Sequence, residues 1–550
     1  MAQQLYFSRD TRMFVQFRNT TDNTENAADL GKGALWEIPI LDGYSFSQTT
    51  NTSEITLAEM ESSAGVSRRG RRMFTDSLAP AEFSFSTYIR PFKSLGQNAI
   101  QANDYDGVKA AELTSGTDVH AVEEVFWASM FGADTYTSQQ FTRGVNAVSG
   151  NVLIPGANTS VITIQESNRS ALHSFVIYFM IDTDTSNPLL YRLPESVINE
   201  VTVDFDVDGI ATLNWSGFSK EVQDISEKVS LSSRHDATVS GGRKGGGNLV
   251  LGDIIVDTGN SRRVSIASNV SSTQATVTQA IDEAITSTQN FIRNRLTAVE
   301  IETADQADKV SGTFPGSFAT VTAITAANPA VVTAAAHGFA IGDVVRVTGT
   351  CGITKAGADV LDGVDLTIAS VTTDTFTTSL NLSSGTSGSF SGTPVAANGK
   401  YSLTLTGGSF NIGNNITYLV PEELGAINKP LEHVTGTRTA TGNATCYITL
   451  DDADTSAGTS RQFFNDLVGT SAMAKVVNKF KVTMHIGGTA ATGNATDPAL
   501  KIIFPTAHIE VPTHSVEDVI SLETNFTALP TDFGSADEIT SITYYKPSSY

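Results

Sequence analysis

One succession of segments occurs twice in this sequence, and this repetition constrains the fold more than any other feature. Residues 43–59 match residues 407–423 without a gap. This match suggests an internal repeat, with a chance likeness of two Thr-rich and Gly-rich β segments as the alternative; composition alone seldom repeats a whole order of elements. The identical pairs are Gly43 and Gly407, Ser45 and Ser409, Phe46 and Phe410, Asn51 and Asn415, and Glu59 and Glu423.

Further segments repeat in the same order around this match. SRDTRMFVQF at 8–17 resembles IRNRLTAVEI at 292–301. PAEFSFSTYIRP at 80–91 has the same alternation of residue types as GNATCYITL at 442–450. A helix, a long strand and a proline-anchored strand pair follow in both halves. We therefore predict that one fold is duplicated. The matched residues are Tyr88 with Tyr447, Pro194 with Pro505, Ile198 with Ile509 and Phe218 with Phe526.

The composition favours a mainly β fold. The 45 glycines occur among many Thr, Ser, Asn and Val residues, which suits short strands and tight turns. Period-two alternation marks strands such as FSFSTYI and VTVDFDVDG, whereas VHAVEEVFWASMFGA at 119–133 and RQFFNDLVG at 461–469 are predicted helices. We expect two tandem β-barrel or sandwich domains with one helix each, and an inserted small β domain.

The 550 residues exceed what one hydrophobic core supports, so several domains are expected. Residues 1–220 form the first domain. Residues 221–290 are a connector, with flexible GGRKGGG and a predicted helix in 271–292. The second domain combines 291–304 and 400–550. Residues 305–399 form a small inserted β-barrel, in the loop that corresponds to the polar run at 19–33, because surface loops tolerate insertions.

The chain is strongly acidic, with 58 Asp and Glu against 35 Lys and Arg and a net charge of −23. Such a chain repels nucleic acid, yet DNA can still be a cargo, because a surface that lets a polyanion slide past must not bind it. The two cysteines, Cys351 and Cys446, lack metal-ligand spacing and are expected to be free. No apolar run has the length of a membrane span or a signal peptide, so we expect a soluble protein without a classical export signal.

The segments from WEIPILDGYSF through STYIRP, at 36–91, and VINEVTVDFDVDGIATLNWSGF, at 197–218, resemble tail tube proteins of long-tailed bacteriophages. The likeness extends over most of 1–220 and 400–547. It implies a hollow tube of stacked rings, in which each domain gives strands to an inner barrel that closes across subunits. Six domains per ring are usual in that family, so two domains per chain imply a homotrimer with pseudo-hexameric symmetry.

The same resemblance implies the partners and the place of the protein. It would assemble in the host cytoplasm into the virion tail, with itself, a tape measure protein, a terminator, a baseplate or tip and, in a contractile tail, a sheath. DNA would be a transient, unbound cargo during genome ejection, and no cofactor or membrane is implied. The inserted segment resembles the FCCH-type domain of ubiquitin-activating enzymes, a likeness of fold that gives no reason to expect ubiquitin chemistry.

Three carboxylates alternate along one strand. Asp204, Asp206 and Asp208 fall at period two, so a strand places them on one face and Val203, Phe205 and Val207 on the other. The functional hypothesis is an acidic face that lines the lumen and keeps DNA from adhering. An ordinary solvated strand face and a cation site at a loop end are the alternatives.

The loop SRRGRRMF sets Arg68, Arg69, Arg71 and Arg72 against this acidic chain. We predict that these arginines form bidentate contacts with carboxylates of a neighbouring subunit or ring. A phosphate-binding patch is less favoured, because the loop lacks interleaved aromatic residues. A solvated loop without partners is the other alternative.

The sequence contains no recognisable active site. His337 has no partner at ligand spacing and is predicted to be a turn or packing residue, and the other histidines are scattered. GGRKGGG lacks the ending of a phosphate loop, and no nucleophile elbow is present. A structural role is therefore favoured over an enzyme. The alternatives are another ring-forming tail component, such as a terminator or baseplate-proximal tube, and a host-surface adhesin that acts through the inserted domain.

Overall fold

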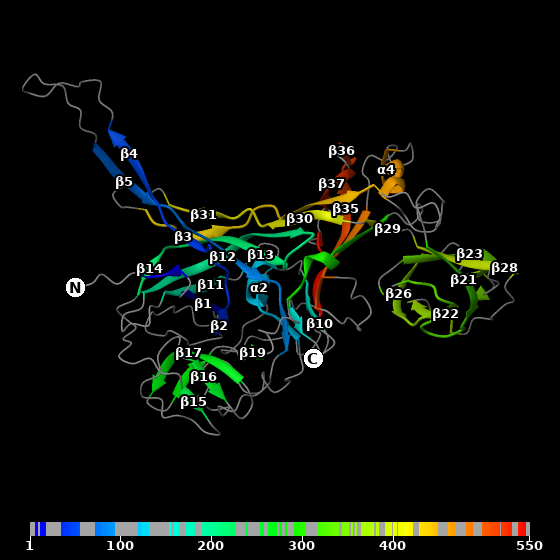
Figure 1. The fold of residues 1–550 in the computed structure, drawn as a ribbon, viewed down its shortest axis with the longest axis horizontal. Coiled ribbons are helices and arrows are strands. Elements are labelled where there is room, and N and C mark those ends of the chain that lie inside the picture. Colours follow the sequence, from blue (N-terminus) through cyan, green and yellow to red (C-terminus); the bar gives the residue numbers. More distant parts are fainter. Residues whose placement is uncertain are drawn as a thin grey trace, which may run out of the picture.

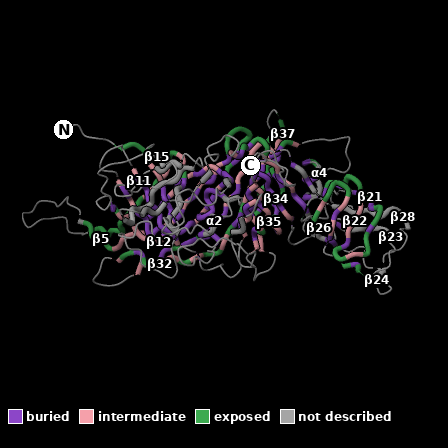
Figure 2. The backbone as a smooth tube through the Cα atoms, turned by 90° about the horizontal axis from the view of Figure 1, so that it is seen from below, coloured by how far each residue is buried: buried purple, intermediate pink, exposed green. Residues whose placement is uncertain are grey.

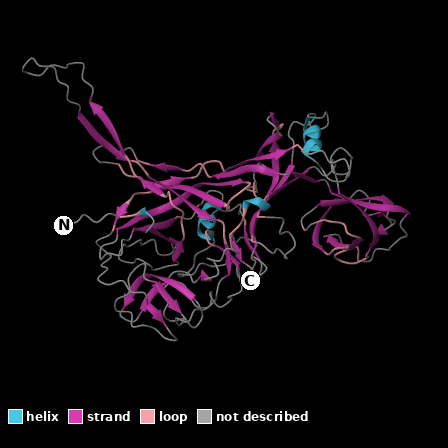
Figure 3. Cartoon of the chain, in the orientation of Figure 1, coloured by secondary structure: helices cyan, strands magenta, loops and turns pink. Residues whose placement is uncertain are grey.

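The structure is a computed structural model in which antiparallel strands dominate (Figure 3), so the fold is mainly β as expected. It describes residues 6–8, 11–17, 35–55, 72–93, 119–131, 153–155, 159–163, 172, 174–181, 189–225, 237–239, 254–257, 262–271, 274–277, 281–282, 291–303, 317–339, 341, 344–350, 354–355, 358–359, 365–378, 381–383, 391–398, 400–403, 405–421, 428–448, 460–468, 480–487, 498–516, 519–530 and 537–545.

The first half is built mainly from antiparallel strands around one helix. Its long strand β12 carries 18 residues and pairs with β11 through its first part and with β13 through its second. The elements are β1 (Thr11–Phe17), β2 (Leu35–Ile38), β3 (Ser45–Ser47), β4 (Thr50–Ile55), β5 (Arg72–Leu78), β6 (Ala81–Tyr88), β7 (Pro91–Lys93), β8 (Val119–Ala121), α2 (Glu124–Phe131), β9 (Leu153–Pro155), β10 (Thr159–Ile162), β11 (Phe175–Ile181), β12 (Leu189–Asp206), β13 (Thr212–Ser219) and β14 (Gln223–Asp224).

The second half has the same kind of architecture. It begins with the short helix η8 and ends with β38, which pairs with β35 of its own half and with β10 of the first half. Its elements are η8 (Asn294–Leu296), β20 (Ala298–Thr303), β29 (Lys400–Leu403), β30 (Leu405–Gly413), β31 (Thr417–Leu419), β32 (Glu432–Val434), β33 (Thr439–Tyr447), α4 (Ser460–Val468), β34 (Phe480–Ile486), β35 (Ala499–Ile509), β36 (Thr513–Val516), β37 (Ile520–Ala528) and β38 (Ser541–Tyr545).

The two halves share their strand pairings. In the first half β1 pairs with β2 and β11, β11 with β12, β12 with β13, β13 with β6, and β6 with β3. In the second half β20 pairs with β29 and β34, β34 with β35, β35 with β37, β37 with β33, and β33 with β30. Each pairing thus has its counterpart, in the same chain order.

The registers also correspond, down to the bulges. The β11–β12 pair shifts register between Phe175 and Ile177, and the β34–β35 pair shifts between Phe480 and Val482. These registers place Pro194 and Ile198 where Pro505 and Ile509 lie, as the sequence match predicted. Two predicted matches are displaced. The cross-strand registers make Gly217, not Phe218, the counterpart of Phe526, and Met13 the counterpart of Val299, two residues from the sequence match.

The halves are joined by a direct strand pair. The second part of β12 runs antiparallel to β30, from Glu200 opposite Gly413 to Asp206 opposite Gly407. Side chains strengthen the joint. Asn414 Nδ2 donates a hydrogen bond of 3.3 Å to the carbonyl oxygen of Ile198, and the hydroxyl of Tyr418 donates one of 2.5 Å to the carbonyl oxygen of Glu195. A single row of strands therefore crosses both halves, in the order β3, β6, β13, β12, β30, β33, β37 and β36. Figure 1 labels β3, β12, β13, β30, β36 and β37 of this row.

One hydrophobic core continues behind this row (Figure 2), and it contains residues of both halves. Trp127 of α2 lies 4.9 Å from Trp215 of β13, measured between ring centroids, and donates a hydrogen bond of 2.7 Å to the hydroxyl of Tyr544 on β38. In the second half Phe504 packs between Phe410 and Phe526. Burial of such large side chains contributes about 1.5–3 kcal/mol each and holds the halves together.

The predicted helices are correct only in part. In residues 119–133 the helix begins at Glu124, because Val119–Ala121 is strand β8 paired with β7. The predicted helix at 461–469 is α4. The predicted helix in 271–292 is wrong where the structure describes it, since β18 and β19 lie there. Strand pairing with β17 overrides the local helical pattern. The sheet in this region contains β15 (Ala237–Val239), β16 (Ile254–Asp257), β17 (Arg262–Ser271), β18 (Gln274–Val277) and β19 (Ile281–Asp282).

The strands between residues 317 and 398 close into a separate barrel. It has its own hydrophobic core, which includes Val332, Ile368 and Phe376. Its barrel strands are β21 (Ser317–Ile324), β22 (Val331–Ala334), β23 (Val344–Thr350), β26 (Asp365–Val371), β27 (Thr375–Thr378) and β28 (Ser391–Asn398), and a small ribbon adds β24 (Thr354–Lys355) and β25 (Ala358–Asp359). The barrel leaves the second half after β20 and returns at β29, where Glu302 lies opposite Lys400.

Candidate functional site

The row of strands from β3 to β36 has one apolar and one polar face. Strand β6 shows why: in AEFSFSTY the buried residues alternate with residues that are exposed or half-buried. The same alternation occurs in β13 and β37. We call the side opposite the core the polar face. Its side chains are Ser45, Ser47, Glu82, Ser84, Ser86, Tyr88, Glu200, Thr202, Asp204, Asp206, Thr212, Asn214, Ser216, Phe218, Ser409, Asn411, Thr439, Thr441, Asn443, Thr445, Tyr447, Thr513, Ser515, Ser521, Glu523, Asn525 and Thr527.

The charges of the polar face have one sign. Its ionisable carboxylates come from three strands, β6, β12 and β37, and none of the side chains that these eight strands place on it is Lys or Arg. Serine, threonine and asparagine fill most of its other positions. Such a surface offers hydrogen bonds but no cation, so it gives a phosphate backbone nothing to pair with. The carboxylates are those of Glu82, Glu200, Asp204, Asp206 and Glu523.

Amide side chains hold several of these carboxylates in place. Asn214 donates to Asp204 Oδ2 at 3.3 Å and accepts from Ser86 at 2.7 Å, which connects three neighbouring strands. Across the joint between the halves, Asn411 donates to Glu200 and to Thr202. These cross-strand contacts fix the polar side chains relative to the sheet.

The structure places the three predicted aspartates as follows. Asp204 and Asp206 are exposed on the polar face, whereas Val203 and Phe205 are buried behind it, as predicted. Asp208 lies beyond the end of β12, in the turn that leads to β13. Val207 was predicted to share the opposite face with Val203 and Phe205, but it lies beyond the strand and is 46% exposed, because the strand ends at Asp206 and the alternation ends with it.

Sequence reasoning missed the rest of the polar face. Glu82 and Glu523 alternate with apolar residues in their own strands, a signal that was available. Nothing local indicated that these strands lie in one row with Asp204, since the pairing partners are far apart in the chain.

The arginine loop lies mostly outside the described residues. Arg68, Arg69 and Arg71 and the side chain of Arg72 fall there, and only the backbone of Arg72, opposite Ile55 at the end of the β4–β5 hairpin, is described. Nearby Met73 and Phe74 are each 60% exposed. At its base the hairpin meets the second half, where the amide of Leu78 donates to the carbonyl oxygen of Asn428 at 2.8 Å.

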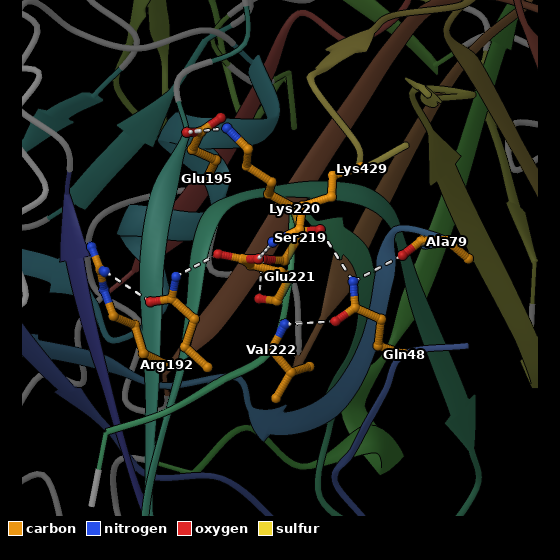
Figure 4. A network of polar contacts seen from close by, with 10 residues as sticks. Gln48, Ala79, Arg192, Glu195, Ser219, Lys220, Glu221, Val222 and Lys429 are labelled. Carbon is orange, nitrogen blue, oxygen red and sulfur yellow. Dashed lines mark hydrogen bonds and ion pairs between the residues drawn. The ribbon is translucent and has the colours of Figure 1, made fainter. Parts of the chain in front are cut away.

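A polar network fixes the chain where β3 ends (Figure 4). Gln48 Nε2 donates to the carbonyl oxygens of Ala79, at 2.9 Å, and Lys220, at 3.3 Å, and its Oε1 accepts from the amide of Val222 at 3.0 Å. Lys220 also forms an ion pair of 3.3 Å with Glu195. The network therefore ties the end of β3 to the segments that follow β5 and β13.

A buried acidic group lies where α2 begins. Glu123 Oε1 accepts a hydrogen bond of 2.5 Å from Tyr544, which in turn accepts from Trp127. Burial raises the pKa of Glu123 to about 8, although the bond from Tyr544 and the charge of Arg90 act in the opposite direction. Burial also lowers the pKa of Arg90. This group connects the first half to β38 of the second half.

The other candidate groups serve packing. His337 is buried, stacks on Phe339 and accepts a hydrogen bond of 3.0 Å from its amide, so it is a packing residue as predicted. Cys446 is free and buried, and burial raises the pKa of its thiol to about 11. Cys351 falls outside the described residues. Among the described residues, no cluster of His, Cys, Asp or Glu could hold a metal ion, and no helix has the length and apolarity of a membrane span.

Comparison with known proteins gives one informative match. No protein-family model matches the chain. The chain is 22% identical over 541 residues to the tail tube protein pb6 of Escherichia phage T5. The alignment covers 97% of this chain and 75% of that protein, so it includes both halves and the inserted barrel.

Proposed function

The chain is homologous to bacteriophage tail tube proteins, and we propose that it polymerises as stacked rings into the hollow tube of a phage tail. The observation that carries this proposal is the polar face, a continuous strand surface that bears carboxylates without any Lys or Arg. A tube needs such a wall, because cationic side chains would hold the DNA that must pass.

The ring consists of three chains with pseudo-hexameric symmetry. The repeated set of pairings supports this arrangement, since two similar halves give one chain two similar wall segments. Three chains then supply six walls. Closure removes the sheet edges at which a free chain would aggregate.

The polar face lines the lumen, with Asp204 and Asp206 on the wall and Asp208 in the turn at its rim. Its negative potential keeps DNA from adhering during ejection. The protein acts in the virion tail, assembles in the host cytoplasm, and contacts other tail proteins such as the tape measure protein, the terminator and the baseplate or tip. Its role is structural, and we assign it no enzymatic activity.

Negative-stain electron microscopy of the purified protein tests this function. We expect rings or tubes with a central channel and threefold or apparent sixfold symmetry. A protein that stays monomeric at all concentrations would contradict the tube, and six chains per ring would contradict the trimer.

A deletion separates the tube from an adhesin. Because Glu302 lies opposite Lys400, residues 305–399 can be replaced by a short turn. A tube subunit should still polymerise without the barrel. If the deleted form assembles but virions carrying it lose attachment to the host, the inserted barrel is an adhesin carried on the tube.

A further inference from the structure

The row of strands that crosses both halves has two unpaired ends. At one end β3 pairs with β6, and at the other β36 pairs with β37. No described strand pairs with the other side of β3 or of β36. In Figure 1 these strands lie toward opposite ends of the row, with β12 and β30 between them. Unpaired edges readily accept a further strand, so their partners are of interest.

The joint between the halves shows how such edges pair in this protein. In it, Thr202 lies opposite Asn411, Val203 opposite Phe410, and Asp204 opposite Ser409. The polar members share the polar face, whereas Val203 and Phe410 are both buried, at 0% and 1% exposure.

Each unpaired edge has its counterpart in this joint. The pairing of β12 with β13 shifts register by one residue between Ile198 and Glu200. In the second half β37 pairs first with β35 and then with β36, and the register of these two pairings differs by the same single residue. With Pro194 matching Pro505, this places Thr513–Val516 where Thr202–Phe205 lies in the first half. Likewise β3 corresponds to Ser409–Asn411 of β30, because β3–β6 and β30–β33 share one register.

The apolar-side residues of β3 and β36 are more exposed than their counterparts in the joint, as expected if each edge strand lacks its neighbouring strand. His514 is exposed although its counterpart Val203 is buried, and Phe46 is half-buried although its counterpart Phe410 is buried. Phe46 already stacks on Phe179 at 5.0 Å, so it is ordered and presents a preformed apolar surface. A strand placed beside β3 would cover it.

We propose that β36 of one chain pairs antiparallel with β3 of a second copy, with Thr513 opposite Ser47, His514 opposite Phe46 and Ser515 opposite Ser45. This inference rests on the proposed function and names the contact that closes the ring. The polar pairs continue the polar face from chain to chain, without any pair of like charges. Each chain offers one edge of each kind, so the contact is head-to-tail, which generates a ring when its rotation closes.

Cysteine cross-linking tests the register, in a background with Cys351→Ser. Cys446 can stay, because its buried thiol with a raised pKa reacts slowly. Chains with Ser45→Cys are co-assembled with chains carrying Ser515→Cys and then oxidised. In the proposed register the two Cα atoms are about 4.5–5.5 Å apart, within the range of a disulfide. The matched control pairs Ser45→Cys with Thr513→Cys, which are two residues out of register and about 7–8 Å apart.

We expect cross-linking in the first mixture to exceed the control by on the order of tenfold. A chain that carries Ser45→Cys and Ser515→Cys together should then give dimers and closed trimers on a denaturing gel. Cross-linked species of up to six chains on the gel would support the strand pairing but contradict the three-chain ring. Equal or absent cross-linking in assembled rings would contradict the pairing and leave the tube intact.

Hydrogen exchange of the unmodified protein gives a second test that needs no variant. The amides of 45–47 and 513–516 should gain protection on assembly, whereas those of the internal joint at 202–205 should be protected already in the free chain. Rings that form without added protection at both edges would overturn the proposal.

Discussion

Phe83 of β6 lies opposite Gly217 of β13, and the second half places the same two residue types in exchanged positions, with Gly442 on β33 opposite Phe526 on β37. In both halves the aromatic ring covers the glycine. A Cβ atom on Gly217 would approach Phe83 Cζ to 2.6 Å, and one on Gly442 would approach two ring atoms of Phe526 to 2.5 Å. The packing requirement is shared, although the strand that supplies the ring differs.

Gly442→Ala and Gly217→Ala should both destabilise the fold, by about 1–3 kcal/mol or more through overpacking. Phe526→Leu should rescue Gly442→Ala in part, because most of that clash is with a side chain. Phe83→Leu should rescue Gly217→Ala much less, because the new Cβ also meets the backbone carbonyl oxygen of Val197. Thermal unfolding midpoints of the single and double variants measure this difference. Equal rescue in both halves would contradict it.

The stability of the parent protein should carry a pH dependence from Glu123. Its pKa is raised from 4.5 to about 8 in the folded state, so the folded chain holds a proton that the unfolded chain releases. The contribution is therefore complete below about pH 4.5, and stability declines as the pH rises toward 8, by at most about 1.4 kcal/mol for each pKa unit. Glu123→Gln keeps the acceptor for Tyr544 without a titrating proton. Unfolding of unassembled protein should show the variant gaining stability relative to the parent between pH 5 and 8, and a constant difference would contradict the buried proton.

Conversion of Asp204, Asp206 and Asp208 to Lys should slow genome ejection, on the order of tenfold at low salt, because the new cations would pair with phosphates. Fluorescent detection of released DNA measures the rate, with tail assembly verified by microscopy. The matched control replaces the same three residues by Asn, which removes the negative charge without adding cations and should slow ejection less. Unchanged kinetics in assembled Lys tails would remove the lumen assignment.

Charge reversal of Arg68, Arg69, Arg71 and Arg72 to Glu should raise the concentration needed for polymerisation by on the order of tenfold or more, if they bind carboxylates of a neighbouring subunit or ring. Light scattering measures polymerisation, and circular dichroism confirms that the free chain stays folded. Replacement of all four by Lys keeps the charge but loses bidentate geometry, so an intermediate effect is expected. Normal polymerisation of the Glu variant would contradict these contacts and favour a solvated loop without partners.

Much of the local structure could be read from the sequence. Alternation in AEFSFSTY predicted the strand, and Asp204 and Asp206 lie on the face of β12 opposite to that of the buried Val203 and Phe205, as the period of two requires. The predicted repeat is matched by the paired registers around Pro194 and Pro505. The prediction of a helix in 271–292 was wrong, because strand pairing with β17 outweighs the weak helical preference of this segment.

For strands with clear alternation, such as β6 and β12, the sequence by itself determined the strand and its polar face, because alternation depends only on neighbours along the chain. Only the tertiary structure decided that Asp204 lies beside Ser409 in one row, and that β3 and β36 are its two ends. The pairing of segments that are some two hundred residues apart depends on the closure of long loops and on core packing shared by both halves. No local pattern encodes it, and the candidate lumen surface exists only once those strands have paired.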